Sequence, residues 1–314
     1  MKGKRILAMI LAVASCLSLA VSASAAGTVN RKATDFKDYD RTAWYAEAIS
    51  AAVDNGLLYG KSSTTLDPNG DMTRAEMAAI INRSFGCYVK ADISKYKDVA
   101  KSKWYYDDVA MAVQMGTYNG RSSSSMAPDA PISRQEAMTV VARALELDYD
   151  AYAKTDLSAF SDRDKISAWA LPYVRAMVGA DYIHGRGKVL APQDNITRAE
   201  FAQIFYNIIG TYIVSKGTYD KDIKGSVLIR TDEVTLKDMT VDGDLIVCGR
   251  FVFTENARTG RDRPAAGLHD SAAALAVAYA DAAALSGSGG RCAADRSDDY
   301  IFSIQGRSGA RRRS

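Results

Sequence analysis

Apolar residues fall at helical spacing in two short stretches, and this pair of stretches recurs three times between residues 35 and 210. In the first copy the earlier stretch predicts an amphipathic helix over residues 43–55. Gly56 follows it, where a helix end favours a residue with positive φ. A loop containing Pro68 then leads to a second helix, expected from Arg74 to about Ser84. The apolar stripe of the first helix consists of Trp44, Ala48, Ile49, Ala52 and Val53.

Each second helix opens on a capping box, in which an N-cap hydroxyl and a carboxylate three residues later satisfy free backbone N–H groups. The three sequences are Thr73-Arg74-Ala75-Glu76, Ser133-Arg134-Gln135-Glu136 and Thr197-Arg198-Ala199-Glu200. Capping accounts for Glu76, Glu136 and Glu200 without a catalytic role. The apolar stripes that follow are Met77, Ile80 and Ile81, then Met138, Val140 and Val141, then Phe201, Ile204 and Phe205.

The three tryptophans, the only ones in the chain, mark the repeat. Trp44 is followed at fixed offsets by Gly56, Gly60, Pro68 and Arg74; Trp104 by Gly116, Gly120, Pro128 and Arg134; and Trp169 by Asp181, Gly185, Pro192 and Arg198, with one residue deleted before the proline. An aromatic-x-Asp precedes each one: Phe36 to Asp38, Tyr96 to Asp98 and Phe160 to Asp162. One helix pair is therefore used three times, and because such a pair cannot bury its apolar face alone, the copies are expected to pack on one another.

The combined pattern of aromatic-x-Asp, Trp, paired Gly, Pro and Thr-Arg-Ala-Glu resembles the S-layer homology domain. The resemblance implies a mainly α fold, with helix-loop-helix repeats at 35–88, 92–148 and 156–210 in a pseudo-threefold spindle. It also implies binding of secondary cell-wall polysaccharide in grooves between repeats, often through a pyruvate ketal; some members bind peptidoglycan instead. The chain departs from the pattern at Gln135 and at Asp181, where the other copies have glycine, so the third groove is the least certain to follow the family.

Arginine at the start of every second helix favours an acidic ligand. A planar guanidinium meets a carboxylate with two parallel donors, and a helix N-terminus also attracts anions. The alternative is a solvated arginine beside a capping box. The tryptophans either stack on sugar rings or belong to the core, and the glycines either admit a ligand or form plain turns. The expected ligand-binding residues are Arg74, Arg134, Arg198, Trp44, Trp104, Trp169, Gly60, Gly120, Gly185, Lys61, Arg121 and Arg186, the last three being loop cations.

The two ends of the chain differ in residue composition and pattern from the repeats. The first residues predict a signal peptide over 1–25, because the basic Lys2, Lys4 and Arg5 are followed by an apolar run and then by small residues. The alternatives are a membrane anchor and a lipoprotein cleaved before Cys16. Residues 211–257 are β-rich and resemble the start of a parallel β-helix; the predicted strands are Tyr212–Val214, Ser226–Ile229, the alternating run Val234–Val241 and Gly243–Val247. Residues 258–314 are low in complexity and are expected to be disordered, with a frameshifted reading frame as our hypothesis for their abrupt onset.

Bulk composition adds little to this picture. The net charge of +3 is too small to favour nucleic acid or a membrane surface, and the two histidines are isolated. The four cysteines match neither a disulfide framework nor a zinc site. We therefore expect no cofactor and no metal. The resemblance and the predicted signal peptide imply a secreted protein of the cell wall of a bacterium, of the Gram-positive type, with no enzymatic activity of its own. The alternatives are an S-layer structural subunit and a wall-anchored carbohydrate-active enzyme whose catalytic domain is missing from the sequence.

Overall fold

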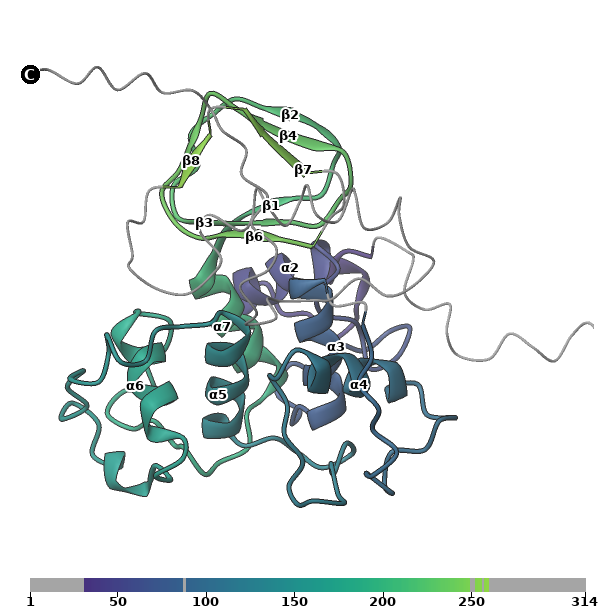
Figure 1. Cartoon of the computed structure of the whole chain (residues 1–314), viewed down its shortest axis with the longest axis vertical. Helices are drawn as coiled ribbons and strands as arrows, with labels where there is room; N and C mark the ends of the chain where they lie inside the picture. Colours follow the sequence, from purple (N-terminus) through teal and green to yellow (C-terminus); the bar gives the residue numbers. More distant parts are fainter. Residues whose placement is uncertain (1–30, 87–88, 249–251, 256, 260–314) are drawn as a thin grey trace, which may run out of the picture.

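A computed structural model describes residues 31–86, 89–248, 252–255 and 257–259. It consists of a helical head and a coil of short parallel strands above it (Figure 1). The predicted signal peptide over 1–25 and all but the first two residues of the predicted tail over 258–314 lie outside the described residues.

Six α-helices make up the described part of the head, two from each repeat. The first helix of repeat 1 begins three residues later than expected, because residues 40–45 form hydrogen-bonded turns, including one in which Asp40 accepts from the Thr42 N–H at 2.8 Å. The helices are α2 (Ala46–Asp54), α3 (Arg74–Phe85), α4 (Tyr106–Gln114), α5 (Arg134–Ala144), α6 (Leu171–Gly179) and α7 (Arg198–Ile208), with 3-10 turns η2 (Ala33–Asp35) and η3 (Arg163–Lys165). The predicted capping boxes are present at α3, α5 and α7.

Each second helix packs on the first helix of the next repeat rather than on its own partner. Helix α3 packs on α4, α5 packs on α6, and α7 returns to pack on α2 (Figure 1). The last pair joins repeat 3 to repeat 1, so the head is a closed ring. None of the three repeats is an independent folding unit in this arrangement.

A triangle of backbone hydrogen bonds marks the centre of the ring. The N–H of Met72 donates to the carbonyl of Ile196, that of Ile196 to Ile132, and that of Ile132 to Met72, each at 3.0 Å. All three side chains are fully buried. Because the bonds run in one direction around the ring, they give the head the pseudo-threefold axis expected of three repeats.

The aromatic-x-Asp motif clamps the loop of its own repeat. The Asp38 carboxylate accepts hydrogen bonds from the N–H groups of Leu66 and Asp67 at 2.7 to 3.1 Å. Asp67 has a φ of 54°, a conformation that a residue with a side chain adopts only when its surroundings hold it there. The same clamp is made by Asp98 on Met126 and Ala127 and by Asp162 on Leu190 and Ala191.

The predicted left-handed position after each first helix is present in all three repeats. Gly56 has a φ of 68°, Gly116 of 71° and Asp181 of 65°. Such a conformation costs a non-glycine residue about 1–2 kcal/mol, and Asp tolerates it better than most. Asp181 therefore leaves the third repeat intact, although it departs from the repeat pattern.

The segment after α7 forms a parallel β-coil with three faces. Its strands are β1 (Ile209–Ile213), β2 (Gly217–Tyr219), β3 (Ser226–Ile229), β4 (Val234–Lys237), β5 (Thr240–Val241), β6 (Leu245–Val247), β7 (Val252–Glu255) and β8 (Arg258–Thr259). They pair as β1-β3-β6, β2-β4-β7 and β5-β8. The expectation of a mainly α chain therefore fits the head only, and the described structure as a whole is α plus β.

The β-coil packs directly against the head. Helix α7 ends at Ile208 and β1 begins at Ile209, so no linker separates them. On β3, Val227 and Ile229 face the core of the coil, whereas Leu228 between them joins the core of the head. This alternation ties the two parts together through one buried sheet. Among the described residues, no helix is both long and apolar enough to span a membrane.

Candidate functional site

A cleft of about 500 Å³ opens where all three repeats meet. We call it cleft B. Repeat 2 supplies the loop 117–121 and one face of α5, repeat 3 supplies Trp169, and repeat 1 supplies Arg74. By the threefold repeat we give the names cleft A and cleft C to the equivalent sets of residues, which are loop 57–61, α3, Trp104 and Arg198 for A and loop 182–186, α7, Trp44 and Arg134 for C. We place Trp104 and Trp44 by the pairing of α4 with α3 and of α2 with α7.

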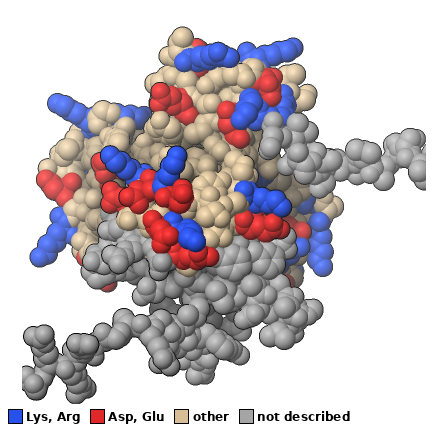
Figure 2. All heavy atoms as spheres, turned by 90° about the horizontal axis from the view of Figure 1, so that it is seen from above, with Lys and Arg blue, Asp and Glu red and all other residues tan. Residues whose placement is uncertain are grey.

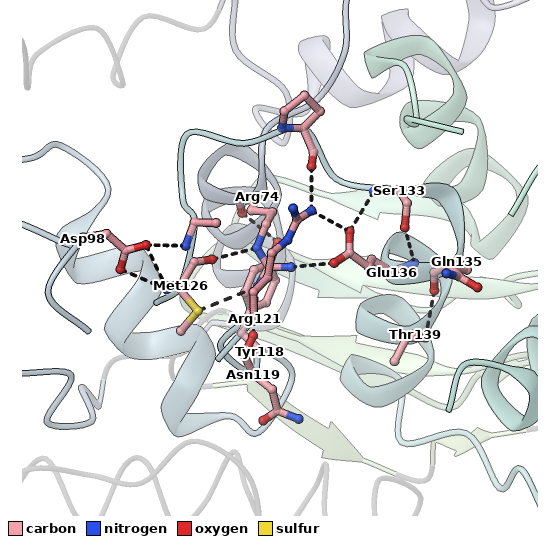
Figure 3. A network of polar contacts seen from close by, with 12 residues as sticks. Arg74, Asp98, Tyr118, Asn119, Arg121, Met126, Ser133, Gln135, Glu136 and Thr139 are labelled. Carbon is pink, nitrogen blue, oxygen red and sulfur yellow. Dashed lines mark hydrogen bonds and ion pairs between the residues drawn. The ribbon is translucent and has the colours of Figure 1, made fainter. Parts of the chain in front are cut away.

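Arg74 is buried at the floor of cleft B and is held by the next repeat (Figure 3). Its Nε donates to the carbonyl of Met126 and its Nη2 to that of Asn119, both at 2.9 Å, and its Nη1 lies 3.3 Å from Glu136. A guanidinium has five N–H donors, and because Nη2 also contacts the Met126 sulfur at 3.8 Å, these four contacts leave one. Arg74 is therefore a link between repeats and also a source of positive charge in the cleft.

The other two helix-start arginines form the same links. Arg134 donates through Nε to the carbonyl of Leu190 at 2.8 Å and lies 3.0 Å from Glu200. Arg198 donates to the carbonyls of Leu66 and Tyr59 and lies 3.5 Å from Glu76. Both are buried. The interpretation of these residues as solvated arginines beside a capping box is thus wrong, because each is enclosed by the following repeat.

Each capping-box glutamate lies between two cations. Glu136 contacts Arg74 from the preceding repeat and Arg121 from its own loop, the latter at 3.2 Å (Figure 3). Glu76 is paired in the same way with Arg198 and, at 2.6 Å, with Lys61. Glu200 is paired with Arg134 and, at 2.6 Å, with Arg186. The glutamates thus join the repeats as well as capping helices, a second role that the sequence pattern does not reveal.

This environment changes the pKa of the buried carboxyls. Burial raises the pKa of Glu76, but the hydrogen bonds from Lys61 and the Thr73 N–H and the charge of Arg198 outweigh it, so the pKa lies below its usual value. The pKa of Glu200 is lowered for the corresponding reasons, with Arg186 and Arg134 as the cations. Both carboxylates are therefore more stable as anions in the folded head than in the unfolded chain.

The head is expected to lose stability in acid. A carboxyl whose pKa is lower in the folded state stabilises the fold at all pH values above its unfolded pKa of about 4.3. This contribution disappears as pH falls through the lower folded value. Unfolding by urea, measured from pH 7 down to pH 3, should show a free energy that falls below about pH 5. The Glu76→Gln and Glu200→Gln double variant should be less stable at pH 7 and show a flatter dependence; an unchanged slope would contradict the assignment.

The tryptophans are exposed, which excludes the interpretation that they belong to the core. Trp44 is 64% exposed, Trp104 is 57% and Trp169 is 51%. Trp44 and Trp104 each make an edge-on contact with the tyrosine that follows them. Trp169 lines cleft B, so the exposed part of its indole is available there for stacking.

The glycines of the loops are explained by packing within each repeat. A Cβ on Gly60 would lie 2.4 Å from the Phe36 ring, and one on Gly120 would lie 2.5 Å from the Tyr96 ring. Gly185 has a φ of 73° and meets Phe160 in the same way, at 2.8 Å. The aromatic of the aromatic-x-Asp motif thus requires glycine at these positions. Gly120 also lines cleft B, so the packing requirement does not remove it from the candidate site.

A third cation distinguishes the clefts from one another. Arg143 lines cleft B, and Arg83 occupies the equivalent position of repeat 1, where its guanidinium lies 3.9 Å from the centre of the Tyr59 ring. The corresponding residue of cleft C is Asn207. In cleft C, moreover, Arg186 also pairs with Asp194 at 2.8 Å. Clefts A and B therefore have an excess of positive charge, whereas the charges named in cleft C balance.

The arrangement is suited to binding rather than to acid–base chemistry. The glutamates at the clefts are already engaged by caps and cations, and within the described residues no group of three or more His, Cys, Asp or Glu is placed to hold a metal ion. Basic and acidic side chains are interspersed on the face seen in Figure 2. That face therefore carries no surface of uniform charge.

Comparison with known proteins gives matches to the repeats. A family model described as the S-layer homology domain matches residues 35–78, 95–138 and 159–202. The "Surface-layer 125 kDa protein" of Lysinibacillus sphaericus is 31% identical over 213 residues, which cover 66% of this chain and 17% of the relative. An "Amylopullulanase" of Thermoanaerobacterium thermosulfurigenes is 28% identical over 200 residues, 59% of this chain and 11% of that enzyme. An "Endoglucanase" of Bacillus sp. (strain KSM-635) is 24% identical over 210 residues, 66% of this chain and 22% of that enzyme. The chain thus matches less than a quarter of the length of each of these relatives.

Proposed function

The three repeats of this chain belong to the S-layer homology domain family, whose members anchor proteins to the cell wall, and we propose that here they do so by holding an acidic wall polysaccharide in clefts A and B. We propose that the protein lies at the bacterial cell surface, because relatives that share its repeats are named as surface-layer proteins. The ligand we favour is a secondary cell-wall polysaccharide that carries a carboxylate, such as a pyruvate ketal.

One observation carries the proposal: cleft B combines an exposed tryptophan with several cations. Trp169 offers an aromatic face for a sugar ring, while Arg74, Arg121 and Arg143 outnumber the carboxylate of Glu136. Apolar sugar faces stack on aromatic rings, and carboxylates pair with guanidinium groups. A charged sugar satisfies both surfaces at once.

We propose that Arg74 acts from the floor of the cleft with its positive charge and with the one donor that its structural bonds leave over. Four of its N–H groups contact repeat 2, and the fifth is left for the ligand. Arg121, whose side chain is exposed, adds a cation at the rim. Gly120 keeps the loop close to the cleft floor because the Tyr96 ring packs against its backbone.

Clefts A and B are proposed to bind more strongly than cleft C. Trp104 and Arg83 give cleft A the same elements as cleft B, whereas cleft C has Asn207 in place of the third arginine and a second carboxylate on Arg186. Two sites on one rigid head would bind a long polymer far more tightly than either site alone, because the second contact is intramolecular.

Anchoring, and not catalysis, is the proposed role of the described residues. Relatives that share these repeats include proteins named as surface-layer proteins and proteins named as enzymes. We propose that the head serves as the same kind of attachment in this chain, whatever else its protein contains.

Binding to isolated cell walls tests the proposal. Purified sacculi of Lysinibacillus sphaericus that retain their polysaccharide should retain the chain in a sedimentation assay, and sacculi stripped of polysaccharide should not. Loss of one charge-assisted contact costs about 1.5–3 kcal/mol, so removal of the whole ligand should abolish binding at micromolar protein. Equal binding to both preparations would contradict a polysaccharide ligand and favour peptidoglycan.

A further inference from the structure

A second basic cavity lies outside the clefts, where the β-coil meets repeat 1. It has a volume of about 760 Å³, and we call it the junction pocket. The head contributes the segment 31–36, the end of α2 and the outer side of loop 58–63. The coil contributes Val214, Ser215 and Arg230. Since the repeats have no counterpart of the coil residues, this pocket is a property of repeat 1 alone.

The lining of the junction pocket is strongly basic. Arg31, Lys32, Lys61 and Arg230 face a single carboxylate, that of Asp54. Lys32 approaches Asp54 only to 3.7 Å, and Lys61 is paired with Glu76 on the cleft side of its loop. The pocket therefore has a surplus of three positive charges among its lining residues, which is unfavourable unless an anion or water screens them.

The two arginines of the pocket are held in place by neutral groups. Arg230 donates to the carbonyls of Asn55 and, at 3.2 Å, of Arg83, at the ends of α2 and α3. The guanidinium of Arg31 lies 4.1 Å from the centre of the Phe36 ring. Neither arginine forms an ion pair with a carboxylate of a described residue. Their positions are thus fixed, while their charges remain available to a ligand.

The other lining groups fit a saccharide. The half-buried Tyr59 provides aromatic surface, and Ser62, Ser63 and Ser215 provide hydroxyl groups at the rim, while Phe36 is buried beneath Arg31. A small inorganic anion would use the charges and leave most of the 760 Å³ to water. A saccharide with a carboxylate or phosphate group would use the charges, the hydroxyl groups and the aromatic ring together.

We infer that the junction pocket binds a further acidic unit of the glycan that occupies cleft A. The two sites are the two sides of one loop: Lys61 contacts Glu76 in cleft A and also lines the junction pocket. A polymer leaving cleft A across residues 59–63 enters the pocket directly. This inference rests on the proposed function, because it takes the ligand class from the clefts. It assigns the β-coil a direct part in wall binding.

The test compares two matched serines in the full chain. Ser63 is exposed in the loop that borders the junction pocket, and Ser123 is its counterpart in repeat 2. Ser63→Asp adds a negative charge beside the pocket and is expected to weaken binding to polysaccharide-bearing Lysinibacillus sphaericus sacculi about fivefold at low salt. Ser123→Asp is expected to change it by less than about 1.5-fold, and Arg31→Ala to weaken it about threefold.

The outcomes separate the inference from the proposed function. A melting temperature within about 2 °C of that of the original chain shows that a variant is folded. If Ser63→Asp does not fold, Arg31→Ala tests the junction pocket instead. Equal binding of Ser63→Asp and Ser123→Asp, with Arg31→Ala unchanged, would overturn the junction pocket and leave the clefts untouched. Failure of the unmodified chain to bind these sacculi would overturn the proposed function itself, and the junction pocket with it.

Discussion

Replacing Arg198 with alanine is expected to lower the free energy of unfolding of the head by about 3–5 kcal/mol, the usual cost of breaking a buried ion pair by removing one partner. Arg198 is only 2% exposed and holds two carbonyls and Glu76 of repeat 1. Without it, the Leu66 carbonyl loses its partner and Glu76 keeps only one cation. Arg198 and Leu66 are 132 residues apart along the chain. Their hydrogen bond joins repeat 3 to repeat 1, so this arginine closes the ring.

Chemical denaturation followed by tryptophan fluorescence measures the effect. Arg163→Ala is the control, since Arg163 is exposed and its ion pair with Asp164 is long, at 3.9 Å; the substitution should cost less than about 0.5 kcal/mol. An Arg198→Ala chain as stable as the control would show that the ring does not depend on this link. The same result would remove the reason we give for an arginine at every helix start.

Replacing both Trp104 and Trp169 with alanine is expected to weaken binding to polysaccharide-bearing sacculi by at least about 100-fold. Large aromatic side chains at the centre of an interface contribute about 2 kcal/mol or more each, and loss of both sites also removes the gain from simultaneous binding. Both side chains are more than half exposed in the described structure. Their removal should therefore leave the melting temperature within about 2 °C.

Trp44→Ala is the matched control for the tryptophan pair. Trp44 has the same place in its repeat and is likewise more than half exposed, but it belongs to cleft C, where Asn207 replaces an arginine. We expect its loss to weaken binding less than about threefold. If Trp44→Ala weakened binding as much as Trp104→Ala, the proposed difference between the clefts would be wrong.

The sequence predicts the local structure of the head well, because local rules determine it. Thr73 with Glu76 predicts the start of a helix, and Gly56 predicts the end of one. The capping box and the positive φ of Gly56 are both present. The repeat predicts that the copies pack on one another, since a two-helix unit must bury its apolar face against its neighbours, whereas the threefold closure was implied by the family resemblance. The strand Ser226–Ile229 was also predicted at its observed bounds, and the run Val234–Val241 is divided into β4 and β5 by a turn.

The contacts between repeats could not be predicted from local sequence rules. Arg74 and Glu136 are 62 residues apart, and no spacing rule says which glutamate an arginine at a helix start will meet. The pattern also assigned Trp44 to the apolar stripe of a helix. Because α2 begins only at Ala46, Trp44 lies before the helix and its side chain stays exposed. The third cation could have been found from the sequence, because the position nine residues after the helix-start arginine is Arg83 in repeat 1 and Arg143 in repeat 2. In repeat 3 the same position is Asn207.

Selective removal of the acidic groups from the wall polysaccharide tests the central claim most directly. The full chain is titrated with Lysinibacillus sphaericus sacculi before and after mild acid hydrolysis that releases ketal-linked pyruvate but keeps the glycan. If guanidinium groups in clefts A and B recognise the carboxylate, affinity should fall at least about tenfold, the equivalent of one charge-assisted contact. Undiminished binding to the hydrolysed walls would contradict recognition of a ketal-borne carboxylate and, with it, the role assigned to the arginine floor of the clefts.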